Sequence, residues 1–291
     1  MRAAGSQYFM VGGYANFSTT SAAATTSYGE VFLDVDNNVF DNVDTSYAKF
    51  NGVTLTQSFL NGSFYQANLT SATLRNIRFT NTNFNGTFIG ATLENIIIGP
   101  SISMNNGDWS GAKLTNVRID TTPSNLNLTK GSLNNVDFSG GLQGANFTDA
   151  VLENVRISYL ANNPTFVRTR ILGDFNIASL FSGSTMIFQD IDFDGATVSG
   201  TLKDINFTNT LKFTHVVFKN LDLCSVTMPL AGAAPHAELA DVKWEGPVKC
   251  PDGIIQIGSA SLYSGTCNYL TRMTNSIAVG ACSATIPGGL Q

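Results

Sequence analysis

Residues 48–98 read AKFNGVTLTQSFLNGSFYQANLTSATLRNIRFTNTNFNGTFIGATLENIII, and this stretch decides the fold. A large apolar residue returns at a five-residue interval through most of it, and a small residue such as Ala67, Ala72 or Ala91 stands two positions earlier. An amphipathic helix repeats at about 3.6 residues and a half-buried strand at about 2, so neither explains the pattern. Four five-residue sides close a coil of about 20 residues, which predicts a β-solenoid. The apolar positions are Phe50, Leu55, Leu60, Leu69, Leu74, Phe79, Phe84, Leu93 and Ile98.

One position of the coil recurs over most of the chain. The phrases ATLRNIRF, ATLENIII, AKLTNVRI, GSLNNVDF and AVLENVRI all begin at the same point of the cycle, so we expect them to stack directly above one another. The leucines of these phrases belong to a column of seven residues that are separated by 19, 19, 21, 19, 19 and 19 positions. The predicted core ladder is Leu55, Leu74, Leu93, Leu114, Leu133, Leu152 and Ile171.

These units resemble the pentapeptide-repeat family, in which a small residue, Asn or Asp, Leu or Phe, and two polar residues follow one another. Units such as ANLTS (67–71), ATLRN (72–76), ANFTD (145–149) and IDFDG (191–195) recur in frame. The resemblance implies an all-β fold, a right-handed quadrilateral β-helix, with the central residue and the residue two before it pointing inward.

The repeat divides the chain into three parts. Residues 39–228 carry the solenoid, residues 1–38 form an N-terminal arm or cap, and residues 229–291 form a C-terminal cap that contains cysteine. The repeat is loosest between Asn162 and Met186, where we expect a loop. Residues 3–29 hold no charged side chain but several aromatic ones, which favours an ordered segment over a linker. Such an arm either pairs with a neighbouring subunit or folds over its own first coil.

The composition favours an exported protein. Charged residues make up 13% of the chain, against about 25% in typical soluble domains, and the net charge is -5. A polar surface with few charges fits an extracellular protein, or subunits that cover one another. No run of about 18 apolar residues is present, so no membrane span is expected. The N-terminus does not show the charged and apolar regions of a signal peptide, so any export signal is of another type or already removed.

The four cysteines lie in the last quarter of the chain. An even number in one segment favours disulfides and leaves three pairings open. Trp244, the sequence CPDG (250–253) and the sequence GTC (265–267) resemble the closing segment of exported bacterial pentapeptide-repeat proteins. That resemblance implies a Cys250–Cys267 disulfide that staples the C-terminal cap, with Cys224 and Cys282 as candidates for a second pair. We therefore expect a secreted or cell-surface protein.

Nothing in the sequence has the spacing of a catalytic site. His215 and His236 are the only histidines, and neither stands near a metal-ligand or nucleophile motif. We therefore expect no catalytic residues, no cofactor-binding residues and no small-molecule substrate, and the protein is predicted not to be an enzyme.

Calcium is the one ligand that the sequence suggests. Asp190, Asp192 and Asp194 begin a D-x-D-x-D-G loop, but Thr201 stands where a calcium loop has its twelfth-position glutamate. Residues Asp34, Asp36 and Asn38 offer a second alternating oxygen set, with Thr45 at its twelfth position. The alternative is that the repeat itself places Asp on either side of Phe193.

The sequence is compatible with three functions. The leading hypothesis is a secreted structural protein, a rigid solenoid that assembles with copies of itself into a filament, sheath or fibre. The second is an extracellular module whose Asn- and Thr-rich faces bind glycan or protein. The third is a topoisomerase inhibitor that mimics DNA, as some family members do. Mimicry needs about one negative charge per 1.7 Å, whereas arginines interrupt the acids here, as in LRNIRF and LENVRI, so no nucleic-acid partner is expected.

The repeat also generates Asn-x-Ser/Thr sequons. They act as glycosylation sites only in a host equipped to modify them. The seven sequons begin at Asn16, Asn61, Asn68, Asn85, Asn127, Asn146 and Asn206.

Overall fold

The structure is a computed structural model in which the described residues contain β-strands and turns but no helix. The chain divides into two compact units, unit 1 (Met1–Asn146) and unit 2 (Phe147–Gln291). The described residues are 39–41, 46–47, 49–52, 54–56, 58–60, 63–179, 187–202, 206–223, 237–240, 243–249, 255–256 and 259–261. The predicted arm before Val39 therefore lies outside the described residues.

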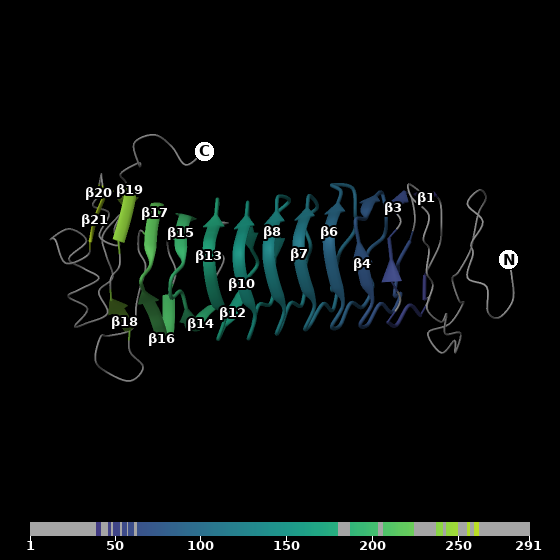
Figure 1. The fold of residues 1–291 in the computed structure, drawn as a ribbon, viewed down its shortest axis with the longest axis horizontal. Helices are drawn as coiled ribbons and strands as arrows, with labels where there is room; N and C mark the ends of the chain where they lie inside the picture. Colours follow the sequence, from purple (N-terminus) through teal and green to yellow (C-terminus); the bar gives the residue numbers. More distant parts are fainter. Residues whose placement is uncertain are drawn as a thin grey trace, which may run out of the picture. The chain divides into compact units, whose positions relative to one another are not determined.

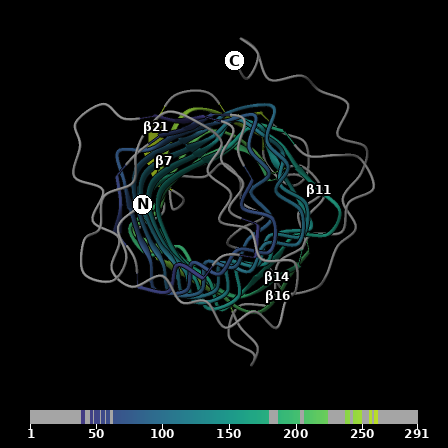
Figure 2. The ribbon, with the colours of Figure 1, turned by 90° about the vertical axis from the view of Figure 1, so that its right-hand side faces the viewer.

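Unit 1 is a parallel β-solenoid, as the period of five predicts. Its blue and teal strands lie side by side in Figure 1, and the end-on view shows its coils overlying one another (Figure 2). The strands are β1 (Val39–Asp41), β2 (Thr54–Leu55), β3 (Ser58–Leu60), β4 (Thr73–Arg75), β5 (Arg78–Thr80), β6 (Thr92–Ile98), β7 (Lys113–Ile119), β8 (Ser132–Phe138) and β9 (Leu142–Gln143).

The register of unit 1 aligns the repeated phrases. Strands β2, β4, β6, β7 and β8 pair in parallel, each with the next. This register stacks one leucine of each strand on that of the next strand, in the order Leu55, Leu74, Leu93, Leu114 and Leu133. Each of these leucines is at most 2% exposed. A one-residue slip would turn the whole column to solvent, so this burial fixes the register.

Three further buried columns complete each coil of unit 1. One contains Phe79, Ile98 and Ile119, a second contains Phe64, Phe84 and Met104, and the third contains Leu69, Phe88, Trp109 and Leu128; all are at most 2% exposed. Ala72, Ala91 and Ala112, two positions before leucines of the first column, are buried as well, because the coil interior leaves room only for a small side chain there. The coil thus has four sides, each with its own inward residue.

The uneven coil lengths have a local cause. In the 19-residue coil from Phe79 to Ile98, the chain takes four residues from Phe84 to Phe88 instead of five. In the following 21-residue coil, it takes six residues from Ile98 to Met104. Length is therefore adjusted within single sides, while the leucine column keeps its register.

The first coil differs from the sequence prediction in one register. Phe59 lies opposite Phe79, and Leu60 lies opposite Thr80, so Phe59 occupies the ladder position that the period of five assigned to Leu60. The regular count failed here because the side from Leu55 to Phe59 takes four residues instead of five.

Unit 2 continues the same architecture with longer strands. Its ladder places Leu152 opposite Ile171. The buried rings of Phe147, Phe166 and Phe188 stack with centroids 4.9 and 4.6 Å apart. Strands β12 and β13 occupy much of the region between Asn162 and Ile177, where a loop was expected. The strands are β10 (Val151–Ile157), β11 (Leu160–Ala161), β12 (Thr165–Val167), β13 (Arg170–Ile177), β14 (Ile187–Asp192), β15 (Thr197–Thr201), β16 (Asn206–Thr214), β17 (Val217–Asp222), β18 (Ala237–Ala240), β19 (Lys243–Lys249), β20 (Ile255–Gln256) and β21 (Ser259–Ser261).

The last coil of unit 2 ends in a change of strand direction. Strand β19 pairs in parallel with β17 but antiparallel with β20 and β21. The chain therefore reverses after β19, and two short strands cover the edge of the last parallel strand.

Candidate interaction surfaces

An exposed ladder of asparagine side chains runs along one corner of unit 1. The amide nitrogen Nδ2 of Asn95 donates to Oδ1 of Asn76 at 2.9 Å, that of Asn116 to Asn95 at 3.0 Å, and that of Asn135 to Asn116 at 2.8 Å. All four residues have φ between +54° and +57°. The ladder therefore joins four successive coils on their outer surface.

Asparagine suits this corner for two physical reasons. It tolerates the left-handed conformation better than most residues with a β-carbon. Its side chain also carries both a donor and an acceptor, so identical residues can bond in an unbroken row. Within β6 and β7, the residues just before and just after Asn95 and Asn116 lie opposite one another. The two asparagines themselves fall between these paired segments. The corner thus turns the chain without interrupting the ladder on either side.

Unit 2 has a corner of its own in which an asparagine is followed by a glycine on the next coil. Asn154 keeps the positive φ, but its Oδ1 accepts a hydrogen bond from the backbone N–H of Asp174 at 3.0 Å. Gly173 has φ +57°, and a β-carbon there would lie 2.3 Å from Asn154 Oδ1. Only glycine fits beside the bonded asparagine.

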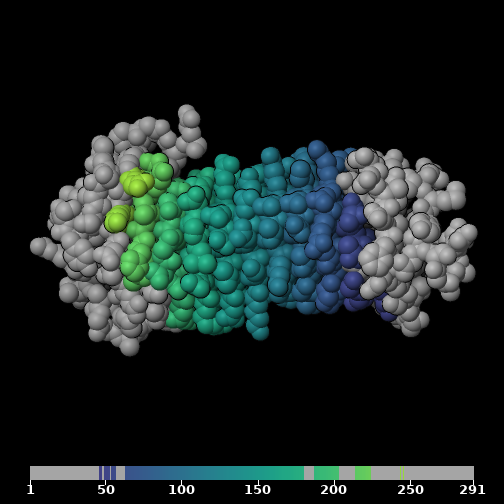
Figure 3. All heavy atoms as spheres, in the orientation of Figure 1, coloured from purple at the N-terminus to yellow at the C-terminus, as the bar shows by residue number. Residues whose placement is uncertain are grey.

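Two ion pairs lie on the surface of unit 1. Arg75 lies 3.0 Å from Glu94, and Arg118 lies 2.6 Å from Asp120. The hydrogen bond from Arg118 to Asp120, together with the charge of Asp120, raises the pKa of Arg118 above its ordinary value. Figure 3 shows this unit as purple, blue and teal bands of successive coils. Such pairing leaves no extended field of one sign around these side chains.

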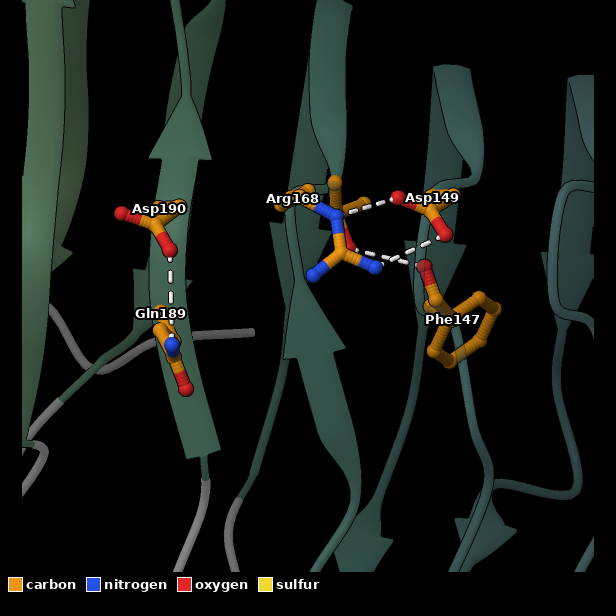
Figure 4. Close-up of polar contacts among 6 residues, drawn as sticks. Phe147, Asp149, Arg168, Gln189 and Asp190 are labelled. Atoms are coloured by element: carbon orange, nitrogen blue, oxygen red, sulfur yellow. Dashed lines mark hydrogen bonds and ion pairs between the residues drawn. The ribbon is translucent and has the colours of Figure 1, made fainter.

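A second charged corner lies in unit 2 (Figure 4). Arg168 donates two hydrogen bonds to Asp149, from Nε at 2.6 Å and from a terminal nitrogen at 2.9 Å. This hydrogen bonding and the charge of Asp149 raise the pKa of Arg168, and Asp190 on the next coil adds to the effect. All three residues have positive φ, so the corner stacks acid, base and acid on successive coils. Beneath it, the buried Thr169 hydroxyl donates to the Phe147 carbonyl at 2.8 Å.

The structure gives the three aspartates of the calcium hypothesis different surroundings. Asp190 belongs to the charged corner, and Asp192 lies 3.9 Å from Arg170 and accepts the backbone N–H of Asp194 at 2.9 Å. Asp194 accepts from the Thr214 hydroxyl at 2.5 Å and lies 3.0 Å from His215 Nδ1. In the described part of the chain, no group of three or more His, Cys, Asp or Glu side chains is arranged to hold a metal ion. The side chains of Asp192 and Asp194 thus form hydrogen bonds and ion pairs with other residues of the solenoid.

Two sequons are built into the wall of unit 1. Oδ1 of Asn68 accepts the backbone N–H of Thr70 at 2.9 Å, and Oδ1 of Asn127 accepts from both the backbone and the hydroxyl of Thr129. Nδ2 of Asn127 also donates to Asp108 at 2.9 Å. In Asn127, the side-chain nitrogen that a glycan would modify therefore already donates a hydrogen bond to the neighbouring coil.

Several expected site residues lie outside the described residues. These include His236 and the second oxygen set at residues 34–38. All four cysteines, Cys224, Cys250, Cys267 and Cys282, also lie there. Within the described ranges, no helix is long and apolar enough to cross a membrane.

A parallel ladder of 19- to 21-residue coils with four buried columns defines a solenoid built from five-residue units. The family model described as pentapeptide repeats matches the chain in eight copies, over residues 48–86 and 63–96. Residues 48–96 therefore carry pentapeptide repeats.

Solved structures of similar proteins include QnrB1 and HetL. QnrB1, a plasmid-mediated fluoroquinolone resistance protein, is 14% identical, with 72% of this chain and 92% of that chain covered and a TM-score of 0.26. HetL, a pentapeptide-repeat protein involved in heterocyst differentiation regulation from the cyanobacterium Nostoc sp. strain PCC 7120, is 18% identical. That match covers 76% of this chain and 94% of HetL, with a TM-score of 0.22. No curated protein matches the chain.

Proposed function

We propose that this chain is an extracellular structural protein without enzymatic activity, whose solenoid associates with copies of itself through the edge at β1. The observation that carries this proposal is the pairing of β1. Strand β1 pairs in parallel with β3, Val39 opposite Ser58 and Asp41 opposite Leu60. Within the described ranges, the register of β1 is defined against β3. An unpaired strand edge is a template for another chain.

The first coil also buries its core least completely. Phe50 is 7% exposed, whereas Leu69 and Phe88, the next residues of its column, are fully buried. The sequence before β1 supports pairing with a neighbour because residues 3–29 contain no charge. Soluble proteins commonly block edges with lysine or other charged residues, and this segment has none of them.

The two ends of the repeat differ, and this difference limits the assembly. At the C-terminal end, β20 and β21 run antiparallel along β19 and cover the last parallel strand. One pairing edge and one covered edge favour a closed pair of subunits related by two-fold symmetry, because an open filament needs two complementary ends. We therefore propose a dimer joined at the β1 ends of its two subunits, in place of the filament expected from the sequence.

DNA mimicry is not favoured by the charge of unit 1. Between residues 46 and 146, six Lys and Arg residues stand beside four Asp and Glu residues. A surface that imitates a phosphate backbone needs a dense excess of negative charge.

The extracellular part of the proposal rests on the cysteine spacing and the low charge. It predicts that Cys250 and Cys267 are joined. Peptide mapping under non-reducing conditions tests this directly, and recovery of both residues as thiols from oxidatively purified protein removes the main argument for export.

A charge placed on the β1 edge tests the assembly. Val39→Lys should convert the paired species to monomer in sedimentation velocity, since a lysine on an edge opposes strand addition. Val151→Lys is the matched control, because Val151 is exposed on a strand in the middle of the ladder. It should leave the assembly unchanged. Equal sedimentation of wild type and Val39→Lys would contradict pairing at β1.

A further inference from the structure

One side of unit 1 differs in character from the rest of its surface. It consists of the segments 63–66, 81–85, 101–106 and 122–125, here called the neutral face. Isolated bridges join Ser63 to Asn83, Asn83 to Ser103, and Asn105 to Ser124, so the four segments lie on successive coils. None of the residues in these segments is charged. The adjoining strands of unit 1, in contrast, carry the ion pairs of Arg75 and Arg118.

Amides and hydroxyls of the neutral face form hydrogen bonds between neighbouring coils and within one coil. Nδ2 of Asn85 donates to the Ser103 hydroxyl at 3.3 Å, and Nδ2 of Asn105 donates to the same hydroxyl at 3.3 Å. Nδ2 of Asn125 donates to Oδ1 of Asn106 at 3.0 Å. Each amide nitrogen carries two hydrogens, and each of these contacts uses one. These bonds therefore hold the side chains in place while a second N–H of each amide points away from that contact.

A tyrosine stands at one end of the neutral face. Tyr65 is 38% exposed and is braced by Tyr47, whose ring lies edge-on with centroids 5.7 Å apart. Nε2 of Gln66 donates to the Tyr65 hydroxyl at 3.2 Å. The other large apolar residues of these segments, Phe64, Phe84, Ile102 and Met104, are buried. Tyr65 is thus a fixed aromatic ring with one polar edge beside the amides of the neutral face.

We infer that the neutral face binds a neutral polysaccharide, with a sugar ring stacked on Tyr65 and the amides hydrogen-bonded to its hydroxyl groups. Sugar hydroxyls donate and accept hydrogen bonds, as amide side chains do, and an uncharged ligand needs no ionised partner. A nucleic acid would need Lys or Arg against its phosphates, and the face has neither. A protein partner would be met by several aromatic, Met or Arg side chains, whereas Tyr65 is alone in this role on the neutral face.

This inference goes beyond the proposed pairing at β1 and does not depend on it, because it concerns the side of the coils and not their end. A monomeric variant such as Val39→Lys should bind polysaccharide as the wild type does.

Affinity electrophoresis in native gels tests the inference. Hydroxyethylcellulose, galactomannan and xyloglucan are the neutral probes, and polygalacturonate and dextran sulfate are the charged ones. At least one neutral polysaccharide should retard the full-length chain, and neither charged polymer should retard it. Tyr65→Ala should weaken binding about tenfold or more, as loss of an aromatic anchor commonly does. Asn105→Asp should also weaken it, because the carboxylate cannot donate.

The matched control is Ile89→Ala. Ile89 is 40% exposed, close to the exposure of Tyr65, but lies outside the neutral face. Its removal should leave retardation unchanged. The inference fails if no neutral probe retards the wild type, if Tyr65→Ala and Ile89→Ala behave alike, or if only the charged probes bind. It also fails if Tyr65→Ala leaves retardation intact but changes the mass in size-exclusion chromatography, since the face is then an interface between copies.

Discussion

Asn116 donates its side-chain amide to Oδ1 of Asn95 at 3.0 Å, and both residues hold φ near +55°. This contact links two coils from the outside, while the leucine column links them from the inside. The same bond repeats to Asn76 and Asn135 on the neighbouring coils. The corner therefore has a defined energetic role that substitution can measure.

Asn116→Ala removes two ladder hydrogen bonds and leaves a β-carbon at positive φ. We expect a loss of about 1–3 kcal/mol in the free energy of unfolding, measured by urea denaturation. Asn116→Gly loses the same hydrogen bonds but tolerates the backbone conformation, so its loss should be smaller by about 1 kcal/mol. If glycine proves as harmful as alanine, backbone strain does not explain the asparagine.

The leucine column should dominate the stability of unit 1. Leu74→Ala or Leu133→Ala empties a fully packed position and should lower the free energy of unfolding by about 2–5 kcal/mol. Arg75→Ala, which breaks only the exposed pair with Glu94, should cost less than about 1 kcal/mol. Similar losses at buried and exposed sites would contradict the inward assignment of the leucines.

Trp109 is a different kind of core residue. Its ring is fully buried against Phe88 and Phe84, with centroids 4.8 and 5.7 Å away, yet its Nε1 has no hydrogen-bond partner in the structure. Trp109→Phe leaves a small gap but also removes a buried donor without an acceptor, which itself costs about 1–3 kcal/mol. The net change should therefore stay within about 1 kcal/mol of zero, well below that of Leu133→Ala.

Fluorescence provides the second measurement at this site. The emission lost in Trp109→Phe should be that of an indole shielded from water, with its maximum at shorter wavelength than that of the unfolded chain. A loss of stability as large as that of Leu133→Ala would show that the indole N–H is satisfied or that its ring volume cannot be replaced.

The Asp149–Arg168 pair should respond to salt but not to pH between about 5 and 9. Hydrogen bonding to Asp149 raises the pKa of Arg168, so its contribution is complete below the ordinary arginine pKa and is lost only as pH rises through the raised value. Asp149→Asn should lower the free energy of unfolding only slightly, because the pair is exposed to solvent, and high salt should reduce the difference from wild type. Urea unfolding at several pH and salt values measures this, and a difference that changes sharply near pH 7 would contradict it.

The sequence predicts the ladder well because burial forces a fixed period. Leu74, Leu93 and Leu114 recur in the same phrase, and the interior accepts only that phrase in register. Leu60 was misplaced because its side of the coil is one residue short, and a constant count cannot locate a missing residue.

The corners were harder to predict than the columns. The asparagine that ends ATLRN, ATLEN and AKLTN also ends GSLNN and AVLEN, so the signal for the ladder was present. Its meaning depends on backbone angles, which a polar residue at a surface position does not reveal. The neutral face was equally hidden, because Tyr65 and Asn105 lie on the same side of the solenoid two coils apart and are forty residues apart in the sequence.

The most direct test of the proposed function is the mass of the full-length chain in solution. Light scattering coupled to size-exclusion chromatography at high protein concentration should give twice the 31.0 kDa of one chain. Deletion of residues 1–29 should reduce the mass to that of a monomer while the β-sheet circular dichroism persists. A full-length chain that remains at 31.0 kDa at every concentration in native salt would contradict assembly through β1.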